Sequence, residues 1–225
     1  MRISIVLPVL NEAASLPRVL QDLQPWRQAG HEVVVVDGGS HDASVALARP
    51  LADAVIQAPR GRASQMNAGA RRAGGEVLLF LHADTRLPPD AAHSLVAGLR
   101  QGACWGRFDV RLSGERAMFR LIERLMNWRS RWSGIATGDQ AIFMTRAAFE
   151  QVGGFPPIPL MEDIAISKRL KGLGRPLCLR GPALTSSRRW EQNGVWRTVL
   201  LMWRLRLAYF LGADPARLAR QYSKS

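Results

Sequence analysis

The sequence predicts an α/β fold built on a doubly wound, mostly parallel sheet with helices on both sides. Short apolar runs rich in β-branched residues alternate with helix-like segments over residues 1–100, which is the order of parallel strands joined by helical crossovers. Polar loops follow several of these runs. The chain has 225 residues and is 47% hydrophobic, so we expect one domain, 1–225, with a sizeable core.

The elements of the first half can be justified in order. The run at 33–36 is continuously apolar, as expected of a parallel strand covered on both faces. Leu16, Val19 and Leu20 share one face of the first helix. We expect strands at 3–7, 32–36, 54–57 and 78–81, and helices at 15–23, 43–52, after the loop 61–69, and at 88–99.

The second half follows a different pattern. Phe108, Val110 and Leu112 alternate with Asp109 and Arg111, which predicts a half-exposed strand rather than a central parallel one. Further along the chain we expect an amphipathic helix around 118–126, an apolar strand at 141–144, and a helix that starts after the stiff, glycine-hinged loop 153–159.

Charge and cysteine content limit the classes of partner. The net charge is +13 and the pI about 11.4, yet the chain has only three lysines. Arginine suits planar phosphate groups, so nucleotides, anionic lipids and nucleic acids are all admissible. The arginines are scattered and no nucleic-acid-binding signature is present, so we expect no nucleic-acid partner. Cys104 and Cys178 lie far apart, and the N-terminal apolar run is too short for a signal peptide, which favours a cytoplasmic protein.

Polar side chains follow three of the predicted parallel strands. They are Asn11 and Glu12, then Asp37, Ser40 and Asp42, then His82 and Asp84. The carboxyl ends of such strands meet in one crevice, so these groups predict a nucleotide site. Asp84 suits a divalent cation that is also held by substrate phosphates, although it could instead cap the following helix. Asp37 could accept a hydrogen bond from uracil or guanine. Neither a P-loop nor a dinucleotide fingerprint is present.

These motifs, taken in order, resemble family 2 glycosyltransferases of the glycosyltransferase-A fold. The resemblance is carried by Pro8-Val-Leu-Asn-Glu12, Val35-Val-Asp-Gly-Gly-Ser-His-Asp42, Asn67-Ala-Gly69, His82-Ala-Asp84, Glu162-Asp163 and Arg188-Arg-Trp190. The stretches 61–70 and 137–140 also resemble a small bacterial subgroup labelled as arsenosugar-biosynthesis-type transferases. The family implies inverting, metal-dependent transfer of a sugar from a nucleoside-diphosphate sugar, with UDP favoured over GDP and Mn²⁺ or Mg²⁺ as cofactor, to an unknown acceptor.

The resemblance also implies roles for individual residues. Asp163 would be the catalytic base and Asp84 the metal ligand. Residues 1–100 would form the nucleotide-binding half and 101–190 the acceptor side. The implied nucleotide contacts are Pro8, Asn11, Glu12, Asp37, Ser40, Arg62, Asn67, His82, Ala83 and Asp84. The implied diphosphate or acceptor contacts are Asp139, Gln140, Glu162, Arg189 and Trp190.

Several of these residues leave alternatives open. The family's metal motif usually reads Asp-x-Asp, whereas His82 holds the first position here, so His82 could contact ribose, ligate the metal or only cap the strand. The pair Glu162 and Asp163 opens a helix, and helix electrostatics alone favour acids there. Asp139 could be a turn former, and Arg62 or Arg189 could be solvated surface residues.

The C-terminal segment 195–225 is expected to contain an apolar helix that makes a further contact. Arg197, Arg204 and Arg206 interrupt it, which argues against a membrane span. The main apolar stripe consists of Trp196, Val199, Leu200, Trp203, Leu207, Phe210 and Leu211, and the opposite side of the helix is apolar too. Such a helix is buried against its own domain and against either a second subunit or a membrane surface. Peripheral binding at the inner face of the cell membrane would fit a lipid-linked acceptor.

Two other functions are compatible with parts of the pattern. A catalytically silent, basic module that binds membranes or nucleic acid could keep the same fold, and His82 in the metal motif is the feature that favours it. A sugar nucleotidyltransferase is disfavoured because no glycine-rich, basic phosphate loop follows the first strand.

Overall fold

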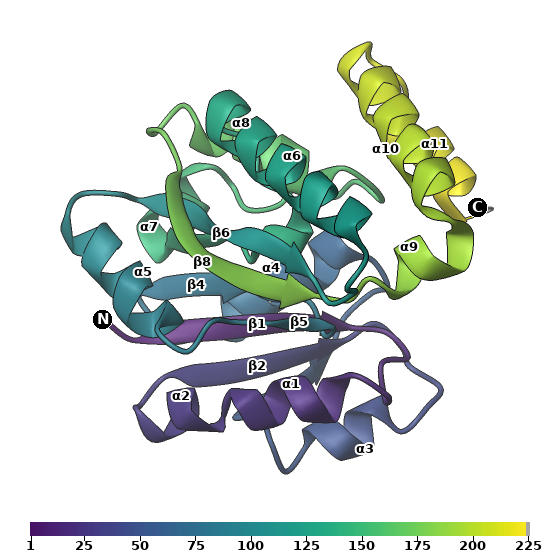
Figure 1. The fold of residues 1–225 in the computed structure, drawn as a ribbon. Helices are drawn as coiled ribbons and strands as arrows, with labels where there is room; N and C mark the ends of the chain where they lie inside the picture. The colour runs from purple at the N-terminus through teal and green to yellow at the C-terminus, as the bar shows by residue number, and fades with distance from the viewer. Residues whose placement is uncertain (224–225) are drawn as a thin grey trace.

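A curled sheet flanked by helices forms the centre of the molecule (Figure 1), and this confirms the predicted α/β fold. The computed structural model describes residues 1–223, without the side chains of Arg189, Asn193 and Ser223. The strands are β1 (Ile3–Val9), β2 (Glu32–Asp37), β3 (Ala54–Gln57), β4 (Val77–Phe80), β5 (Thr85–Arg86), β6 (Trp105–Leu112), β7 (Phe143–Thr145) and β8 (Leu177–Thr185). Their order across the sheet is β3-β2-β1-β4-β7-β6-β8-β5.

The helices connect and cover these strands. They are α1 (Leu16–Asp22), α2 (Gln24–Gln28), α3 (Ser44–Ala48), α4 (Arg62–Arg72), α5 (Ala91–Arg100), α6 (Ala117–Ser133), α7 (Arg146–Gln151), α8 (Glu162–Leu170), α9 (Arg188–Asn193), α10 (Val195–Phe210) and α11 (Pro215–Ser223), with a short 3-10 helix η1 (Gly138–Gln140).

The strands β3, β2, β1 and β4 run parallel, as the sequence predicts. The apolar side chains of β2, β1 and β4 are buried on both faces of the sheet, and those of β3 are partly buried. The helix α4 lies tightly on β1 and β2, because a Cβ atom on Gly69 would come within 2.3 Å of Val6 Cγ1. The helix also begins earlier than expected: Gly61 turns the chain with φ of +140° and Arg62 is already helical. The start of α4 therefore lies beside the carboxyl ends of β1 and β2.

The prediction that 108–112 form a half-exposed strand rather than a central parallel one is wrong in its placement. β6 lies inside the sheet, antiparallel to β7 and parallel to β8. The expected alternation holds at its end, where Arg111 is exposed, but Arg107 is fully buried. Its charge is compensated, since Arg107 pairs with Asp109 and donates from Nη2 to the Asn127 carbonyl oxygen at 3.2 Å. A paired arginine can occupy an inner strand.

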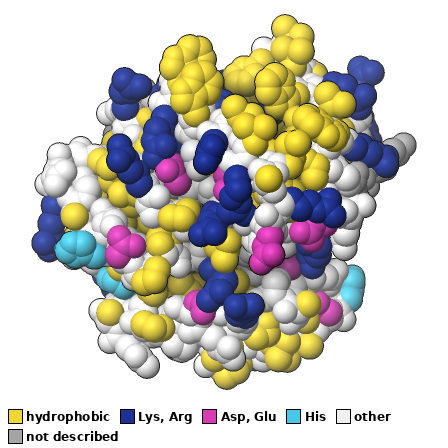
Figure 2. All heavy atoms as spheres, viewed as in Figure 1, with side chains coloured by type: hydrophobic (Ala, Val, Ile, Leu, Met, Phe, Trp, Pro, Cys, Tyr) yellow, Lys and Arg dark blue, Asp and Glu magenta, His cyan; other side chains and the backbone are white. Residues whose placement is uncertain are grey.

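The helix α10 has one buried and one exposed apolar face. Leu205 is fully buried, in a cluster with Ile164 of α8. The predicted stripe points outward, so that Trp203 is 71% and Leu200 68% exposed. Hydrophobic side chains of α6 and α10 accordingly gather on one side of the molecule, with arginines and lysines among them (Figure 2). Within residues 1–223, no helix is both long enough and apolar enough to cross a membrane.

Candidate active site

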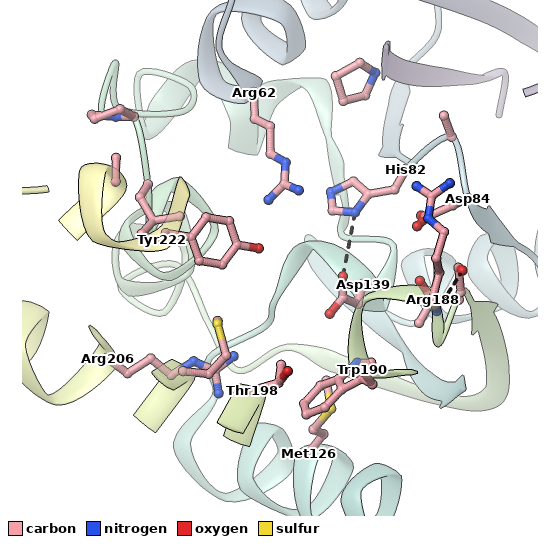
Figure 3. Close-up of a pocket in the computed structure, with 18 of the residues that line it drawn as sticks. Arg62, His82, Asp84, Met126, Asp139, Arg188, Trp190, Thr198, Arg206 and Tyr222 are labelled. Carbon is pink, nitrogen blue, oxygen red and sulfur yellow. Dashed lines mark hydrogen bonds and ion pairs between the residues drawn. The ribbon is translucent and has the colours of Figure 1, made fainter. Parts of the chain in front are cut away.

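A cavity of about 1300 Å³ opens beyond the ends of β1 and β4, between the sheet and the helices α6, α10 and α11. Glu12, Arg62, His82 and Asp84 line one end of it, and side chains of α6 and α10 line the other (Figure 3). Ligand pockets commonly measure roughly 300–1,000 Å³, so this cavity has room for two substrates at once. We call these parts the strand end and the helix end.

The loops that follow β1 and β2 are fixed by their own polar side chains. Asp37 is buried and accepts backbone N–H groups from Gly39 at 2.9 Å and from Ser40 at 3.1 Å. Ser40 Oγ accepts the Asn11 N–H at 2.8 Å, and Asn11 Oδ1 accepts the His41 N–H at 2.8 Å. Asn11, Asp37 and Ser40 do not line the cavity, whereas Pro8 does. Their role as nucleotide contacts stays a prediction.

A buried glutamine that the sequence analysis missed joins these strand ends. Gln65 Nε2 donates to the carbonyl oxygens of Val9 and Val36, both at 2.8 Å. A Cβ atom on Gly38 would lie 2.9 Å from Gln65 Oε1, so the glycine makes room for the amide. The sequence feature that could have indicated this role is Gln65 itself, a polar residue on the otherwise apolar inner face of α4.

Asn67 has a supporting position rather than a place in the cavity wall. Its Nδ2 donates to the Phe155 carbonyl oxygen at 2.8 Å, and its Oδ1 accepts the Phe155 N–H at 2.9 Å. Both ends of the amide are thus occupied by one backbone unit, and Asn67 is not among the residues that line the cavity. The position of Asn67 favours support of the backbone, and its role as a nucleotide contact stays a prediction.

His82 and Asp84 both face the cavity, with Ala83 between them. Burial lowers the pKa of His82 to about 4, and Arg62 adds to this effect while Asp84 opposes it. His82 is therefore neutral at pH 7 and has an available lone pair. Its ring lies against η1, since a Cβ atom on Gly138 would be 2.5 Å from His82 Nε2, and His82 Nδ1 lies 3.7 Å from Asp139 Oδ1.

The alternative that Asp84 caps the next helix is wrong. The helix α5 begins at Ala91 with Asp90 at its N-cap, so Asp84 lies outside it. Asp84 is partly buried, and Thr85 Oγ1 donates to its Oδ1 at a long 3.4 Å. Among the described residues, no group of three His, Cys, Asp or Glu side chains forms a ready-made metal site. Asp84 and neutral His82 together supply an incomplete set of ligands.

The acid pair at the start of α8 combines burial with fixed orientation. Asp163 Oδ2 accepts the Gly138 N–H at 3.0 Å, and Oδ1 accepts the Ile164 N–H at 2.7 Å. Burial raises the pKa of Asp163 in spite of these bonds. Burial and the charge of Asp163 raise the pKa of Glu162 to about 7, against the effect of Arg62. Asp163 is partly exposed. Its hydrogen-bond donor Gly138 directly precedes Asp139, and Asp139 lines the cavity.

Arg62 is the cation at the centre of these acids. Burial disfavours its charge, but Glu162, Tyr222, Asp139 and Asp163 together raise its pKa. The side chain projects into the cavity between His82 and Tyr222 (Figure 3). The residue is exposed to water and lines the cavity, and its guanidinium provides a permanent positive charge at the strand end.

The segment 188–190 contributes Arg188 and Trp190 to the cavity wall, and the expected place of Arg189 near the diphosphate stays a prediction. Arg188 lines the cavity with Nη2 4.0 Å from Glu12 Oε2, whereas the side chain of Arg189 lies outside the described residues. Trp190 lines the cavity and packs against the cluster of Leu112, Phe119 and Ile122. Arg188 and Arg189 are adjacent, and no sequence pattern shows which of the two faces the cavity.

Gln140 is buried and has a structural role. Its Oε1 accepts the Thr137 N–H at 3.1 Å, which completes a capping box at the start of η1, and its Nε2 donates to Asn127 Oδ1 at 3.4 Å. It does not line the cavity, so the expected acceptor contact is not supported by its position. Gln140 holds η1 and, with it, Asp139 and Gly138.

Comparison with known proteins identifies relatives of this chain. The model of glycosyl transferase family 2 matches residues 4–153, which is more than half of the chain. An undecaprenyl-phosphate 4-deoxy-4-formamido-L-arabinose transferase from Pseudomonas fluorescens (strain Pf0-1) is 33% identical over 154 residues, covering 61% of this chain and 44% of that protein. The chain thus spans less than half the length of this relative.

Solved structures share the fold. A mannosyltransferase from Pyrobaculum calidifontis in complex with GDP-Man and Mn²⁺ has a TM-score of 0.65 at 22% identity, covering 97% of this chain and 68% of that chain. S. aureus TarS 1-349 in complex with UDP-GlcNAc also has a TM-score of 0.65, at 18% identity, covering 83% of this chain and 58% of that chain. This similarity establishes the glycosyltransferase-A fold. The ligands of this chain have to be inferred from the chemistry of its own residues.

Proposed function

The chain belongs to glycosyl transferase family 2, and from this premise we propose that it transfers a sugar from a nucleoside-diphosphate sugar to a lipid-linked acceptor with inversion at the anomeric carbon. The observation that carries the proposal is the strand end of the cavity, where Asp84 and Arg62 face the same space and the Asp163 carboxylate lies beside Asp139. The donor is a UDP-sugar or, as the second choice, a GDP-sugar.

The residues at the strand end fit a divalent cation that is shared with the donor. Mg²⁺ and Mn²⁺ are held by oxygen ligands, and Mg²⁺ typically takes one or two carboxylates plus substrate phosphates and water. Asp84 offers one carboxylate, and neutral His82 can add a nitrogen ligand or orient a bound water. The bound ion would supply stabilisation of the charge that develops on the departing diphosphate.

The protein's own groups account for the remaining chemistry. The acceptor oxygen attacks the anomeric carbon as the bond between that carbon and the diphosphate breaks, and the electron pair leaves with the nucleoside diphosphate. Arg62, held positive by the surrounding acids, stabilises the diphosphate, and Arg188 can reach it from α9. Asp163 takes the proton of an attacking hydroxyl. Its two backbone hydrogen bonds fix its orientation, and its raised pKa makes it a stronger base than an ordinary aspartate.

A lipid-linked acceptor is supported by the helix end of the cavity. The exposed side chains of Trp128, Trp196 and Trp203 line it, and tryptophan beside arginine suits a membrane surface. A relative named as an undecaprenyl-phosphate transferase agrees with this choice. We propose that the exposed stripe of α10 contacts the membrane in which such an acceptor lies.

A panel of nucleotide sugars tests the proposed function. Purified protein is incubated with each donor and Mn²⁺, and release of nucleoside diphosphate is measured with and without EDTA. We expect slow, metal-dependent release from one donor, because water replaces the missing acceptor. If no nucleoside diphosphate binds or is released with any donor, the chain is a silent module on this fold rather than a transferase.

A further inference from the structure

Three buried nitrogen atoms at the helix end of the cavity have no partner. Nε and Nη2 of Arg129 and Nε of Arg206 are buried, and no acceptor among the described residues is within hydrogen-bonding reach of them. A buried donor without an acceptor destabilises the protein, and more so when it carries charge. Both side chains line the cavity. An acceptor group from a ligand would remove this cost.

The two arginines belong to the two helical walls of the cavity. Arg129 is on α6, and Arg206 is on α10 beside the buried Leu205. Figure 3 shows Arg206 directed toward Thr198, on the side of the cavity opposite Arg62 and His82. The cations that serve the donor, Arg62 and Arg188, are at the strand end, so the helix-end pair remains for a second anion.

The acids near Arg129 do not replace such an anion. Burial lowers the pKa of Arg129, Arg107 adds to this, and the charges of Asp163 and Asp139 oppose it. Neither acid makes a hydrogen bond to Nε or Nη2 of Arg129. An arginine keeps its charge under these conditions.

The surface that continues from these arginines is apolar. Leu121, Leu125 and Trp128 of α6 and Trp196 and Trp203 of α10 line the cavity and are 48–71% exposed. An anion site that opens onto an apolar groove matches one molecule with a charged head and a hydrocarbon tail. A free nucleotide or inorganic phosphate would leave the groove unused.

We propose that Arg129 and Arg206 bind a phosphate group of the acceptor, whose hydrocarbon chain leaves the cavity between α6 and α10. This assignment rests on the proposed function, because it divides one cavity between a donor and an acceptor. Arginine forms paired, charge-assisted hydrogen bonds with phosphate oxygens, which supplies the acceptors that the buried nitrogen atoms lack. The two arginines hold the acceptor's phosphate whether the attacking atom is a phosphate oxygen or a hydroxyl oxygen of the acceptor.

Calorimetric titration with geranyl phosphate tests the assignment. The variants are Arg129→Met and Arg206→Met, each with a matched control on the same helix, Arg124→Met and Arg204→Met, whose side chains are exposed and outside the cavity lining. We expect each cavity variant to bind about tenfold or more weakly, since a hydrogen bond to a charged group contributes about 1.5–3 kcal/mol and 1.4 kcal/mol is tenfold. The controls should bind like the wild type.

Two further ligands separate the phosphate from the hydrocarbon. Geraniol, which lacks the phosphate, and inorganic phosphate, which lacks the chain, should each bind more weakly than geranyl phosphate. Equal binding of geraniol would overturn the phosphate site, and equal binding of inorganic phosphate would overturn the groove. Unchanged affinity for geranyl phosphate in both cavity variants would overturn the role of the arginines.

The same variants are titrated with UDP and Mn²⁺. Retained UDP binding shows that they are folded and that the strand end is intact, so a loss of geranyl phosphate binding can be assigned to the helix end. If the wild type binds geranyl phosphate in the expected manner but no nucleoside diphosphate, the acceptor site stands and the proposed donor chemistry fails.

Discussion

The two ends of the cavity differ in how far the protein satisfies its own polar groups. Behind the strand end, Asp37, which does not itself line the cavity, and Gln65 are hydrogen-bonded to backbone groups that fix the loops after β1 and β2. At the helix end, Arg129 and Arg206 have buried N–H groups without a hydrogen-bond partner among the described residues, and Trp203 is 71% exposed.

This difference indicates two modes of recognition. A site whose polar groups are already positioned binds a rigid, charged ligand with little reorganisation, as expected for a nucleoside diphosphate. A site with unpaired cations and exposed apolar surface is completed by its ligand, as expected for an amphiphilic acceptor. The predictions below test this contrast, starting with the largest expected effect.

Replacing Asp163 by Asn removes the proposed base while nearly preserving its size. Because a positioned general base contributes ~10²–10⁴ in rate, transfer to a hydroxyl acceptor should fall by about that factor. UDP affinity should stay unchanged, since the Asp163 carboxylate accepts hydrogen bonds from the N–H groups of Gly138 and Ile164 and is not one of the groups proposed to hold the diphosphate. Single-turnover assays with excess enzyme measure this, and normal transfer by the variant would refute the assignment of the base.

Replacing Asp84 by Asn should abolish metal-dependent binding at the strand end. A ligand at ~100 times its dissociation constant stabilises the folded state by ~2.7 kcal/mol, and we expect UDP with Mn²⁺ to raise the melting temperature of the wild type accordingly. The variant should show little of this shift, and EDTA should remove it from the wild type. Asp90→Asn, at the N-cap of α5, is the control. An equal shift in the Asp84 variant would exclude Asp84 as the ligand.

Replacing Asn67 by Ala tests whether the strand end depends on supporting hydrogen bonds. The change leaves the N–H and carbonyl groups of Phe155 without their partner, which should lower the free energy of unfolding by about 1–3 kcal/mol. Urea denaturation measures this, with the exposed Gln21→Ala as control. UDP affinity of the folded variant should match the wild type. A selective loss of UDP binding at full stability would instead identify Asn67 as a nucleotide contact.

The raised pKa of Glu162 predicts a dependence of stability on pH. The pKa is about 7 in the folded chain against an ordinary 4.5, so between these values the folded state binds more protons than the unfolded state. Stability should therefore fall as the pH rises from 4.5 to 7. Glu162→Gln should remove this contribution, and the exposed Glu150→Gln should leave it in place. Denaturation curves across this pH range that are parallel for the wild type and Glu162→Gln would contradict the assignment.

The smallest effect on stability is expected at the exposed stripe. Trp203→Ser should change the free energy of unfolding by no more than about 0.5 kcal/mol, because the side chain is largely exposed. Its affinity for geranyl phosphate should nevertheless fall. Leu205→Ala, two positions away and fully buried, should cost about 2–5 kcal/mol. A Trp203 variant that bound geranyl phosphate normally would separate this tryptophan from the acceptor groove.

The parallel half of the fold could be predicted because its signals are local. Continuous apolar runs, such as the buried β2, and polar loops mark each strand and its carboxyl end. The second half, where strands pair both parallel and antiparallel, could not be predicted in this way, because the pairing of these strands depends on residues that are distant in the sequence. The alternation at 108–112 predicted a half-exposed strand, whereas β6 begins at Trp105 and lies inside the sheet, where the contacts of Arg107 with Asp109 and Asn127 accompany its burial.

The candidate site divides in the same manner. Arg62, His82 and Asp84 line the cavity as the motifs suggested, because their places follow from strand order. Gln140 and Asn67 occur in motifs but support the backbone, and a motif does not distinguish contact from support. Arg129 and Arg206 gave no signal, since a buried and unpaired arginine is recognised only from its surroundings.

Amide hydrogen exchange with each ligand tests the division of the cavity most directly. UDP with Mn²⁺ should protect the loop around Asp84 and the start of α4, and geranyl phosphate should protect the second half of α6 and α10 around Arg206. Each ligand should leave the other end at its unliganded rate. Protection of α10 by UDP with no change near Asp84 would contradict the two-ended site.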